Sequence, residues 1–139
     1  MKTLAAHLSF NGNCEEAFTF YKSALGGEFI NKQIYADMPA IDKPVPDALK
    51  SKIMHIEYKF DDVVIMGADG MDERAPKIGN NVGLMLDMTD ENEQETVFNK
   101  LSAGGTINMP LQDVFWGAKF GAFTDKFGVD WMLNCYKKK

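Results

Sequence analysis

Histidine and cysteine are scarce in this sequence, and its basic residues are not clustered. Its 139 residues include only two histidines and two cysteines, and the formal net charge is −5. Basic residues form no cluster except Lys137–Lys139, which we interpret as a solvent-exposed end. A nucleic-acid surface needs a clustered positive stripe. We therefore expect no nucleic-acid partner.

Long apolar runs are also missing. No stretch of 18 apolar residues occurs, so we expect no membrane span. The chain starts Met1-Lys2-Thr3 without an apolar signal segment, and Cys14 and Cys135 are expected to stay reduced, which predicts a cytoplasmic protein. With 45% hydrophobic residues, the chain is sufficient for a single domain (1–139) with a core.

The chain is expected to contain two copies of one structural module. Shifting the sequence against itself by 78 positions places Gly26-Gly27 on Gly104-Gly105 and Phe20 on Phe98. In each copy an alternating apolar strand leads to a polar cap, a helix and a glycine pair that ends the helix.

Three further strands follow each helix. Module 1 (about 1–68) is predicted to contain strands 4–10, 28–36, 52–60 and 62–67, with a helix capped by Asn13 whose core face is Ala17, Phe20, Tyr21 and Leu25. Module 2 (about 81–136) is predicted to contain strands 82–88, 106–114, 118–124 and 129–136, with a helix capped by Asp90 whose core face is Val97, Phe98 and Leu101. This order predicts an α+β fold of two βαβββ modules that form an open half-barrel of mixed sheets with the helices outside. Two irregular loops, 37–51 and 68–80, connect strands.

Residues 110–133 are dense in aromatic side chains and glycines and predict two tight turns, at Trp116–Lys119 and Asp125–Gly128. Two parts of the chain carry a family pattern: Gln112-x-x-Phe115-Trp116-Gly117-x-x-Phe120-Gly121-x-x-x-Asp125-x-Phe127-Gly128-Val129-x-Trp131-Met132, and, near the start, Phe10-Asn11-Gly12-Asn13-Cys14-Glu15-Glu16-Ala17 with Phe20-Tyr21. In these residues the chain resembles the PhnB-like branch of the vicinal oxygen chelate superfamily. That superfamily includes glyoxalase I, extradiol dioxygenases and the bleomycin and fosfomycin resistance proteins. The resemblance covers nearly the whole chain and implies the fold, but no particular reaction.

The resemblance also implies where a metal would bind. The superfamily's enzymes use His and Glu side chains from the first and last strands of each module. The matching positions here are Ala6, Met66, Gly83 or Leu84, and Met132, none of which is a ligand for a hard dication. His7 is next to the first position, and a bulge at Asn11-Gly12 would turn it into the cavity. One imidazole makes no metal site, so we expect neither a metal nor another cofactor.

The sequence offers two candidate catalytic arrangements. His55 and Glu57 lie two apart on the polar face of their strand, where they can relay a proton or form a structural pair. Cys14 at a helix start is a candidate for a lowered pKa, but no second histidine is near it in sequence. Some relatives of this branch are labelled ubiquinone methyltransferases. The sequence shows no nucleotide-binding βαβ unit for a methyl donor, because both glycine pairs follow helices.

The expected ligand pocket combines methionines, rings and a few polar groups. Its predicted members are His7, Met66, Met85, Phe115, Trp116, Asp130 and Met132. Thioethers form adaptable walls for an apolar ligand, although methionines also fill gaps in cores.

The sequence is compatible with three functions. The first is binding of a small organic molecule in a metal-free concave pocket. The second is a lyase or isomerase that uses a metal or the His55–Glu57 relay. The third is a protein whose only partner is itself.

We also expect a homodimer, because pairing of modules across a two-fold axis closes sheet edges, with segment 115–123 at the contact.

Overall fold

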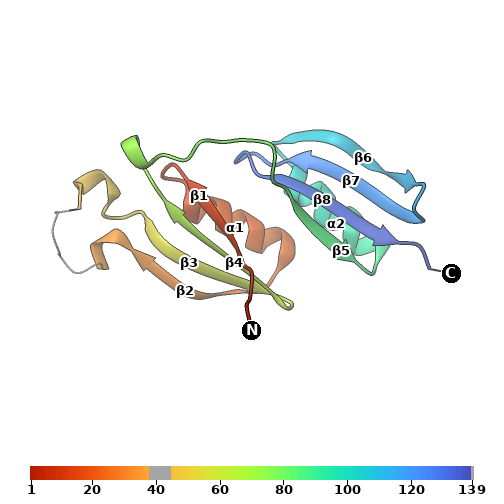
Figure 1. Ribbon diagram of the computed structural model, residues 1–139, viewed down its shortest axis with the longest axis horizontal. Coiled ribbons are helices and arrows are strands. Elements are labelled where there is room, and N and C mark those ends of the chain that lie inside the picture. The colour runs from red at the N-terminus through yellow and green to blue at the C-terminus, as the bar shows by residue number, and fades with distance from the viewer. Residues whose placement is uncertain (38–44, 139) are drawn as a thin grey trace. The chain divides into compact units, whose positions relative to one another are not determined.

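The computed structural model describes residues 1–37 and 45–138. It divides into two compact units, Met1–Lys77 and Ile78–Lys139 (Figure 1). Pro39 and Pro44 of the predicted loop lie outside the described residues. Within the described ranges, no helix is both long and apolar enough to cross a membrane.

Each unit has the order βαβββ. Unit 1 contains β1 (Ala6–Phe10), α1 (Cys14–Leu25), β2 (Glu28–Ile34), β3 (Ile53–Phe60) and β4 (Val63–Asp69). Unit 2 contains β5 (Leu84–Met88), α2 (Glu91–Ser102), β6 (Thr106–Val114), β7 (Ala118–Thr124) and β8 (Asp130–Tyr136). Short 3₁₀ turns at Tyr35–Asp37, Asp47–Leu49 and Asp72–Arg74 lie in connecting segments. Every predicted strand is present, with each end within two residues of the prediction.

Each unit has one mixed four-stranded sheet. The strand orders are β1-β4-β3-β2 and β5-β8-β7-β6. The first and last strands of each unit pair in parallel, and the other pairs are antiparallel. The helix of each unit covers one face of its own sheet, so the two faces differ in burial.

The core of unit 1 lies between α1 and its sheet. Its helix residues Cys14, Ala17, Phe18 and Tyr21 are buried, at the spacing of one helical face. A Cβ at Gly67 on β4 would lie 2.5 Å from Cε2 of Phe18, so this glycine lets the ring approach the strand. The prediction that Phe20 faces the core was wrong, since Phe20 is only half-buried. In α2, the predicted Val97, Phe98 and Leu101 are all buried.

The two helices begin with different caps. Asp90 Oδ1 accepts hydrogen bonds from the backbone N–H groups of Asn92 (2.7 Å) and Glu93 (3.2 Å), as expected. Asn13 makes no such bond. Instead, buried Asp69 at the end of β4 accepts from the backbone N–H groups of Cys14 and Ile53, each at 2.9 Å. The predicted Asn13 cap was wrong because a carboxylate 55 residues away takes its place.

The Cys14 thiol is expected to be unreactive in this environment. Burial raises its pKa well above the usual value, and the negative charges of Asp69 and Glu15 raise it further. The thiolate is the reactive form, so a raised pKa leaves the thiol protonated across neutral and mildly alkaline pH. The environment therefore argues against Cys14 as a nucleophile.

Neither thiol of the chain is expected to react with DTNB at pH 8 while the protein is folded, because Cys14 and Cys135 are 0% and 1% exposed. In denaturing urea both should react. A stoichiometric reaction of the native protein within seconds would contradict this account of Cys14.

Candidate functional site

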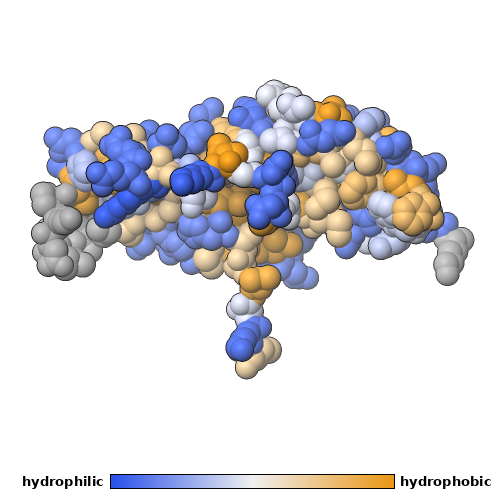
Figure 2. All heavy atoms as spheres, turned by 45° about the horizontal axis from the view of Figure 1, so that its top comes forward, coloured by the Kyte–Doolittle hydropathy of each residue, from blue (hydrophilic) through white to orange (hydrophobic). Residues whose placement is uncertain are grey.

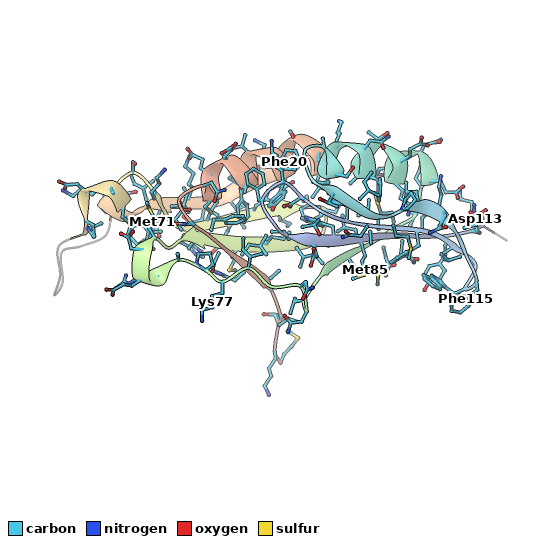
Figure 3. All side chains as sticks on the ribbon, turned by 90° about the horizontal axis from the view of Figure 1, so that it is seen from above. Phe20, Met71, Lys77, Met85, Asp113 and Phe115 are labelled. Atoms are coloured by element: carbon cyan, nitrogen blue, oxygen red, sulfur yellow. The ribbon has the colours of Figure 1, made fainter. Side chains whose placement is uncertain are left out.

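In each unit, the face of the sheet turned away from the helix is called the open face. Because successive strand residues point to opposite faces, residues next to a helix-facing one lie on the open face. Gly67 meets Phe18 of α1, so Met66 and Ala68 belong to the open face of unit 1. Gly121 meets Phe98 of α2, so Phe120 and Ala122 belong to the open face of unit 2. In Figure 3, Met85 and Phe115 lie on the side of the unit 2 sheet away from α2.

The open face of unit 1 carries His7, Met66 and Glu57 as neighbours across β1, β4 and β3. His7 is exposed and Met66 half-buried. Ala6 is paired instead with buried Ile65, on the helix side. The structure therefore places His7, rather than Ala6, on the open face of the first strand.

His55 and Glu57 on β3 are close together. His55 Nε2 lies 2.9 Å from Glu57 Oε1, and their side chains are 30% and 27% exposed. A carboxylate at this distance can orient the imidazole by hydrogen bonding. The arrangement suits either a proton relay or a structural pair, so the catalytic hypothesis stays a prediction.

The open face of unit 2 carries three methionines in one line across the sheet. Across β5, β8, β7 and β6, strand pairing places four residues side by side: Met85, Met132, Ala122 and Met109. We call these four residues the methionine row. Met85 is 53% and Met109 37% exposed, whereas Met132 is half-buried. A Cβ at Gly83 would lie 3.2 Å from Cε of Met132. On β5, the residue paired with Met132 is Met85.

One side of the methionine row is bordered by a hydrogen-bonded chain. Trp116 Nε1 donates to Asn134 Oδ1 at 3.0 Å, and Asn134 Nδ2 donates to Asp87 Oδ1 at 3.0 Å. The Trp116 ring also meets the edge of Phe120 at a centroid distance of 5.3 Å. Asn134 is only 3% exposed. These contacts hold the indole in a fixed position at the open face.

The other side of the row carries Asp130. Its Oδ1 accepts a hydrogen bond from Thr124 Oγ1 at 2.5 Å, and Thr124 Oγ1 in turn accepts from Asn108 Nδ2 at 3.1 Å. Asp130 is half-buried. The methionine row therefore lies between two carboxylates, Asp87 and Asp130.

Phe115 is placed differently from Trp116. It is 96% exposed in the turn between β6 and β7, and its ring meets Trp116 at 5.0 Å. Figure 2 shows apolar side chains exposed as separate areas among hydrophilic ones. Of the two predicted rings, Trp116 is the one that is fixed on the open face.

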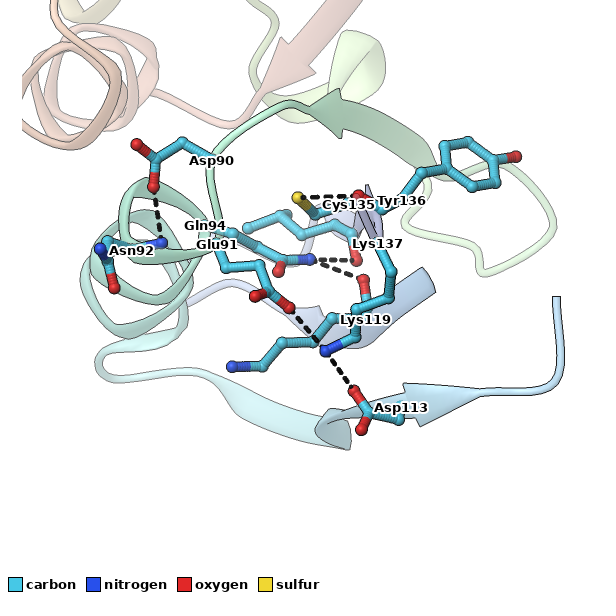
Figure 4. Close-up of polar contacts among 10 residues, drawn as sticks. Asp90, Glu91, Asn92, Gln94, Asp113, Lys119, Cys135, Tyr136 and Lys137 are labelled. Atoms are coloured by element: carbon cyan, nitrogen blue, oxygen red, sulfur yellow. Dashed lines mark hydrogen bonds and ion pairs between the residues drawn. The ribbon is translucent and has the colours of Figure 1, made fainter. Parts of the chain in front are cut away.

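Two depressions in the surface lie away from all predicted site residues. One, of about 420 Å³, is lined by residues at the start of α2 and the end of β8. The other, of about 240 Å³, is at the start of α1. At the first, Lys137 Nζ contacts Glu91 Oε1 at 2.7 Å and Asp113 Oδ1 at 2.8 Å (Figure 4). Lys137 is thus ion-paired, contrary to the prediction of a purely solvated tail.

Within 1–37 and 45–138, no group of three or more His, Cys, Asp or Glu side chains is arranged to hold a metal ion. The predicted metal-free state remains a prediction.

Sequence reasoning missed several residues of the open face. Asp87, Phe120 and Met109 were not assigned to it, and the role of Asn134 in holding Trp116 was not foreseen. Strand alternation gives a usable signal for Asp87, which is the lone charge in Leu84–Met88. The pairing of Trp116 with Asn134 depends on how two strands meet and has no local signal.

Comparisons with known proteins agree with this architecture. The family model described as 3-demethylubiquinone-9 3-methyltransferase matches residues 2–134. Protein YjdN of Escherichia coli K12 is 33% identical over 98% of this chain and 97% of its own. Among solved structures, PA1353 of Pseudomonas aeruginosa has a TM-score of 0.88 and 36% identity, covering 99% of this chain and 100% of that one. The Bacillus cereus structure described as a putative 3-demethylubiquinone-9 3-methyltransferase, PhnB protein, has a TM-score of 0.78 and 28% identity over 96% and 99%.

A more distant structure shows the fold alone. The glyoxylase/bleomycin resistance protein/dioxygenase domain from Frankia sp. EAN1pec has a TM-score of 0.65 at 11% identity, over 99% of this chain and 98% of that one. The chain therefore belongs to the family that the 3-demethylubiquinone-9 3-methyltransferase model describes, a PhnB-like family with the vicinal oxygen chelate fold.

Proposed function

We propose that this protein binds a small organic molecule, without a metal ion, on the open face of unit 2. The observation that carries the proposal is the methionine row bordered by the fixed Trp116 ring. Thioether side chains adapt to ligands of different shape. A ring that is already held in place loses little freedom when a ligand stacks on it. Small-molecule sites commonly combine an apolar lining with a few polar groups.

The alternative, that these methionines only fill gaps in a core, fits the exposures less well. Met85 is 53% and Met109 37% exposed, whereas a gap-filling side chain is expected to be enclosed. Contiguous exposed apolar groups bordered by polar ones often mark binding surfaces.

The test is a titration with Nile red, a neutral dye that fluoresces in apolar sites. We expect saturable binding that Trp116→Ala weakens about ten-fold, since losing an aromatic contact costs about 1–1.5 kcal/mol. Ile107→Ala is the control, because Ile107 is 52% exposed but pairs with buried Phe123 on the helix side of the sheet, and it should change binding less than two-fold. If the dye showed no saturable binding, or both variants behaved alike, the proposal would be wrong. Native mass spectrometry of gently purified protein would identify a co-purifying ligand.

The description of the matching family names a methyltransferase, but we do not propose methyl transfer. Gly26-Gly27 and Gly104-Gly105 follow α1 and α2, whereas a nucleotide-binding fingerprint precedes its helix.

A second candidate function rests on the 2.9 Å contact between His55 Nε2 and Glu57 Oε1. As a general base, the imidazole would remove a proton from a carbon next to a carbonyl, as an isomerase or lyase requires. Dihydroxyacetone in D₂O is a suitable probe. A relay predicts deuterium uptake faster than buffer, with His55→Gln reduced about 100-fold or more. Equal rates for wild type and variant would favour a structural pair.

We further propose that the chain forms a homodimer through segment 115–123, in which Phe115 is 96% exposed. Light scattering should then report about twice the 15.5 kDa chain mass at micromolar concentration. Phe115→Ser should shift the equilibrium toward monomer. A mass of one chain across that range would contradict the proposal.

A further inference from the structure

Among the described residues of unit 2, the charged side chains on the open face are all negative. Asp87 and Asp130 both lie on this face, in the rows of residues on either side of the methionine row. The described lysines of unit 2 lie elsewhere: Lys100 is on α2, Lys119 pairs with Asp113 and Cys135 on the helix side, Lys126 is in the β7–β8 turn, and Lys137 and Lys138 line the depression at α2. Unit 2 contains no arginine. The open face of unit 2 is therefore apolar and anionic.

Each of the two carboxylates has an oxygen available to a ligand. Asp87 Oδ1 accepts from Asn134, and Asp130 Oδ1 accepts from Thr124. Among the described residues, no hydrogen bond or ion pair reaches the second oxygen of either side chain, in contrast to Asp113, which is paired with Lys137. An accessible carboxylate beside an apolar surface favours a positively charged or hydrogen-bond-donating group.

The aromatic side of the face favours the same charge. Trp116 and Phe120 meet edge to face beside Asn134, whose amide links Trp116 to Asp87. The faces of aromatic rings carry partial negative charge and attract cations, most strongly for tryptophan. Asp87 and Trp116 thus favour positive charge along one side of the methionine row.

Spacing limits the size of the ligand. Residues two apart on a strand are separated by about 7 Å, so each carboxylate row lies about one ring's length from the methionine row. A planar body of two or three rings can cover the row while its charged group reaches Asp87 or Asp130.

We propose that the ligand of this face is an aromatic organic cation, an amine, amidine or quaternary ammonium attached to or part of a flat ring system. This inference rests on the proposed function of the open face of unit 2 and adds the charge of the ligand to it. Aromatic anions are rejected because they would meet two carboxylates without a compensating base.

The experiment compares three dyes by equilibrium dialysis against the full chain: thioflavin T (cationic), Nile red (neutral) and anilinonaphthalene sulfonate (anionic). We expect thioflavin T to bind at least about ten-fold more tightly than the sulfonate. Its binding should weaken as the salt concentration is raised, because salt screens exposed charges. Nile red binding should be insensitive to salt.

Variants that remove one negative charge show which carboxylates favour the cationic dye. Asp87→Asn and Asp130→Asn keep an oxygen that can accept from Asn134 or Thr124, so the local hydrogen bonds can persist. Each is expected to weaken thioflavin T about five-fold, the size of an exposed ion pair, and to leave Nile red unchanged. Glu95→Gln on the exposed side of α2 makes the same change of net charge and should affect no dye.

The outcomes separate the two proposals. Preference for thioflavin T that falls in both Asp variants supports the cation inference. Equal affinity for all three dyes, or Asp variants that match Glu95→Gln, overturns the cation inference and leaves the proposed function standing. If none of the dyes binds, the proposed function falls, and the cation inference falls with it.

Discussion

Replacing Asp125 with alanine is expected to destabilise the protein by about 4 kcal/mol, because three buried or half-buried donors lose their acceptor at a typical cost of 1–3 kcal/mol each. Asp125 is 3% exposed. Its Oδ1 accepts from the backbone N–H groups of Phe127 (2.8 Å) and Val129 (3.0 Å), and its Oδ2 accepts from Trp131 Nε1 at 2.9 Å. One carboxylate thus closes the β7–β8 turn and anchors the core tryptophan.

The measurement is a urea titration followed by circular dichroism. Asp113→Ala provides a control, since Asp113 is an exposed acid on β6 of the same unit whose surface ion pair is expected to contribute less than about 1 kcal/mol. Asp125→Asn should fall in between, because an amide can serve the two backbone donors but presents N–H groups to the indole. Equal midpoints for Asp125→Ala and Asp113→Ala would show that the turn does not depend on this carboxylate.

Replacing Met132 with tryptophan is expected to abolish Nile red binding while leaving the melting temperature close to wild type. Met132 lies in the middle of the methionine row, is half-buried, and points to the open face. A larger side chain there can extend over Met85 and Ala122, where the ligand is proposed to lie, without displacing core residues. In a packed core, the same enlargement lowers the free energy of unfolding by about 1–3 kcal/mol.

Met132→Ala completes this comparison. On an open face it should cost less than about 1.5 kcal/mol, well below the 2–5 kcal/mol typical of a buried methionine. Leu133→Trp is a matched control, because Leu133 is the next residue on β8, fully buried on the helix side, and should unfold or severely destabilise the protein. A severe loss of stability for Met132→Trp would identify Met132 as a core residue and contradict the site.

Most of the fold could be predicted because the signals are local. Alternating apolar residues, polar helix starts and the two glycine pairs each act within a few residues, so the βαβββ order and the strand limits follow from them. Gly27 and Gly105 show why the pairs are needed: a Cβ at either would lie about 2 Å from a carbonyl oxygen, 2.1 Å at Lys59 and 2.2 Å at Thr124.

Predictions based on the repeat failed where the two modules differ in detail. The shift of 78 residues that superposes the strands also places Phe20 on Phe98, but Phe18 is the ring that packs against the sheet in unit 1. Helical register can slip relative to the strands without disturbing either glycine pair. The cap of α1 also differs from the repeat pattern, because Asp69 rather than Asn13 accepts the hydrogen bond from Cys14 N–H. Asp69 reaches the start of α1 only after β4 pairs with β1.

The candidate site was predictable only in part. Strand alternation placed His55, Glu57, Asp130 and Met132 on the face away from the helix, and the structure agrees with that placement. The row of Met85, Met132 and Met109 depends on the register of three separate strand pairs. The bond from Trp116 to Asn134 depends on how the β6–β7 turn folds back over β8. Such contacts join distant segments, so composition and spacing carry no information about them.

The most direct test of the central claim is a nuclear magnetic resonance titration of protein labelled with ¹³C at the methionine methyl groups. The proposed site predicts that Nile red shifts the signals of Met85, Met109 and Met132 together, with one dissociation constant. Met88, three residues after Met85 on the same strand but opposite Cys135 on the helix side, should remain unchanged. Shifts at Met88 as large as those of the methionine row, or no shift at Met132 at saturating dye, would contradict binding on the open face of unit 2.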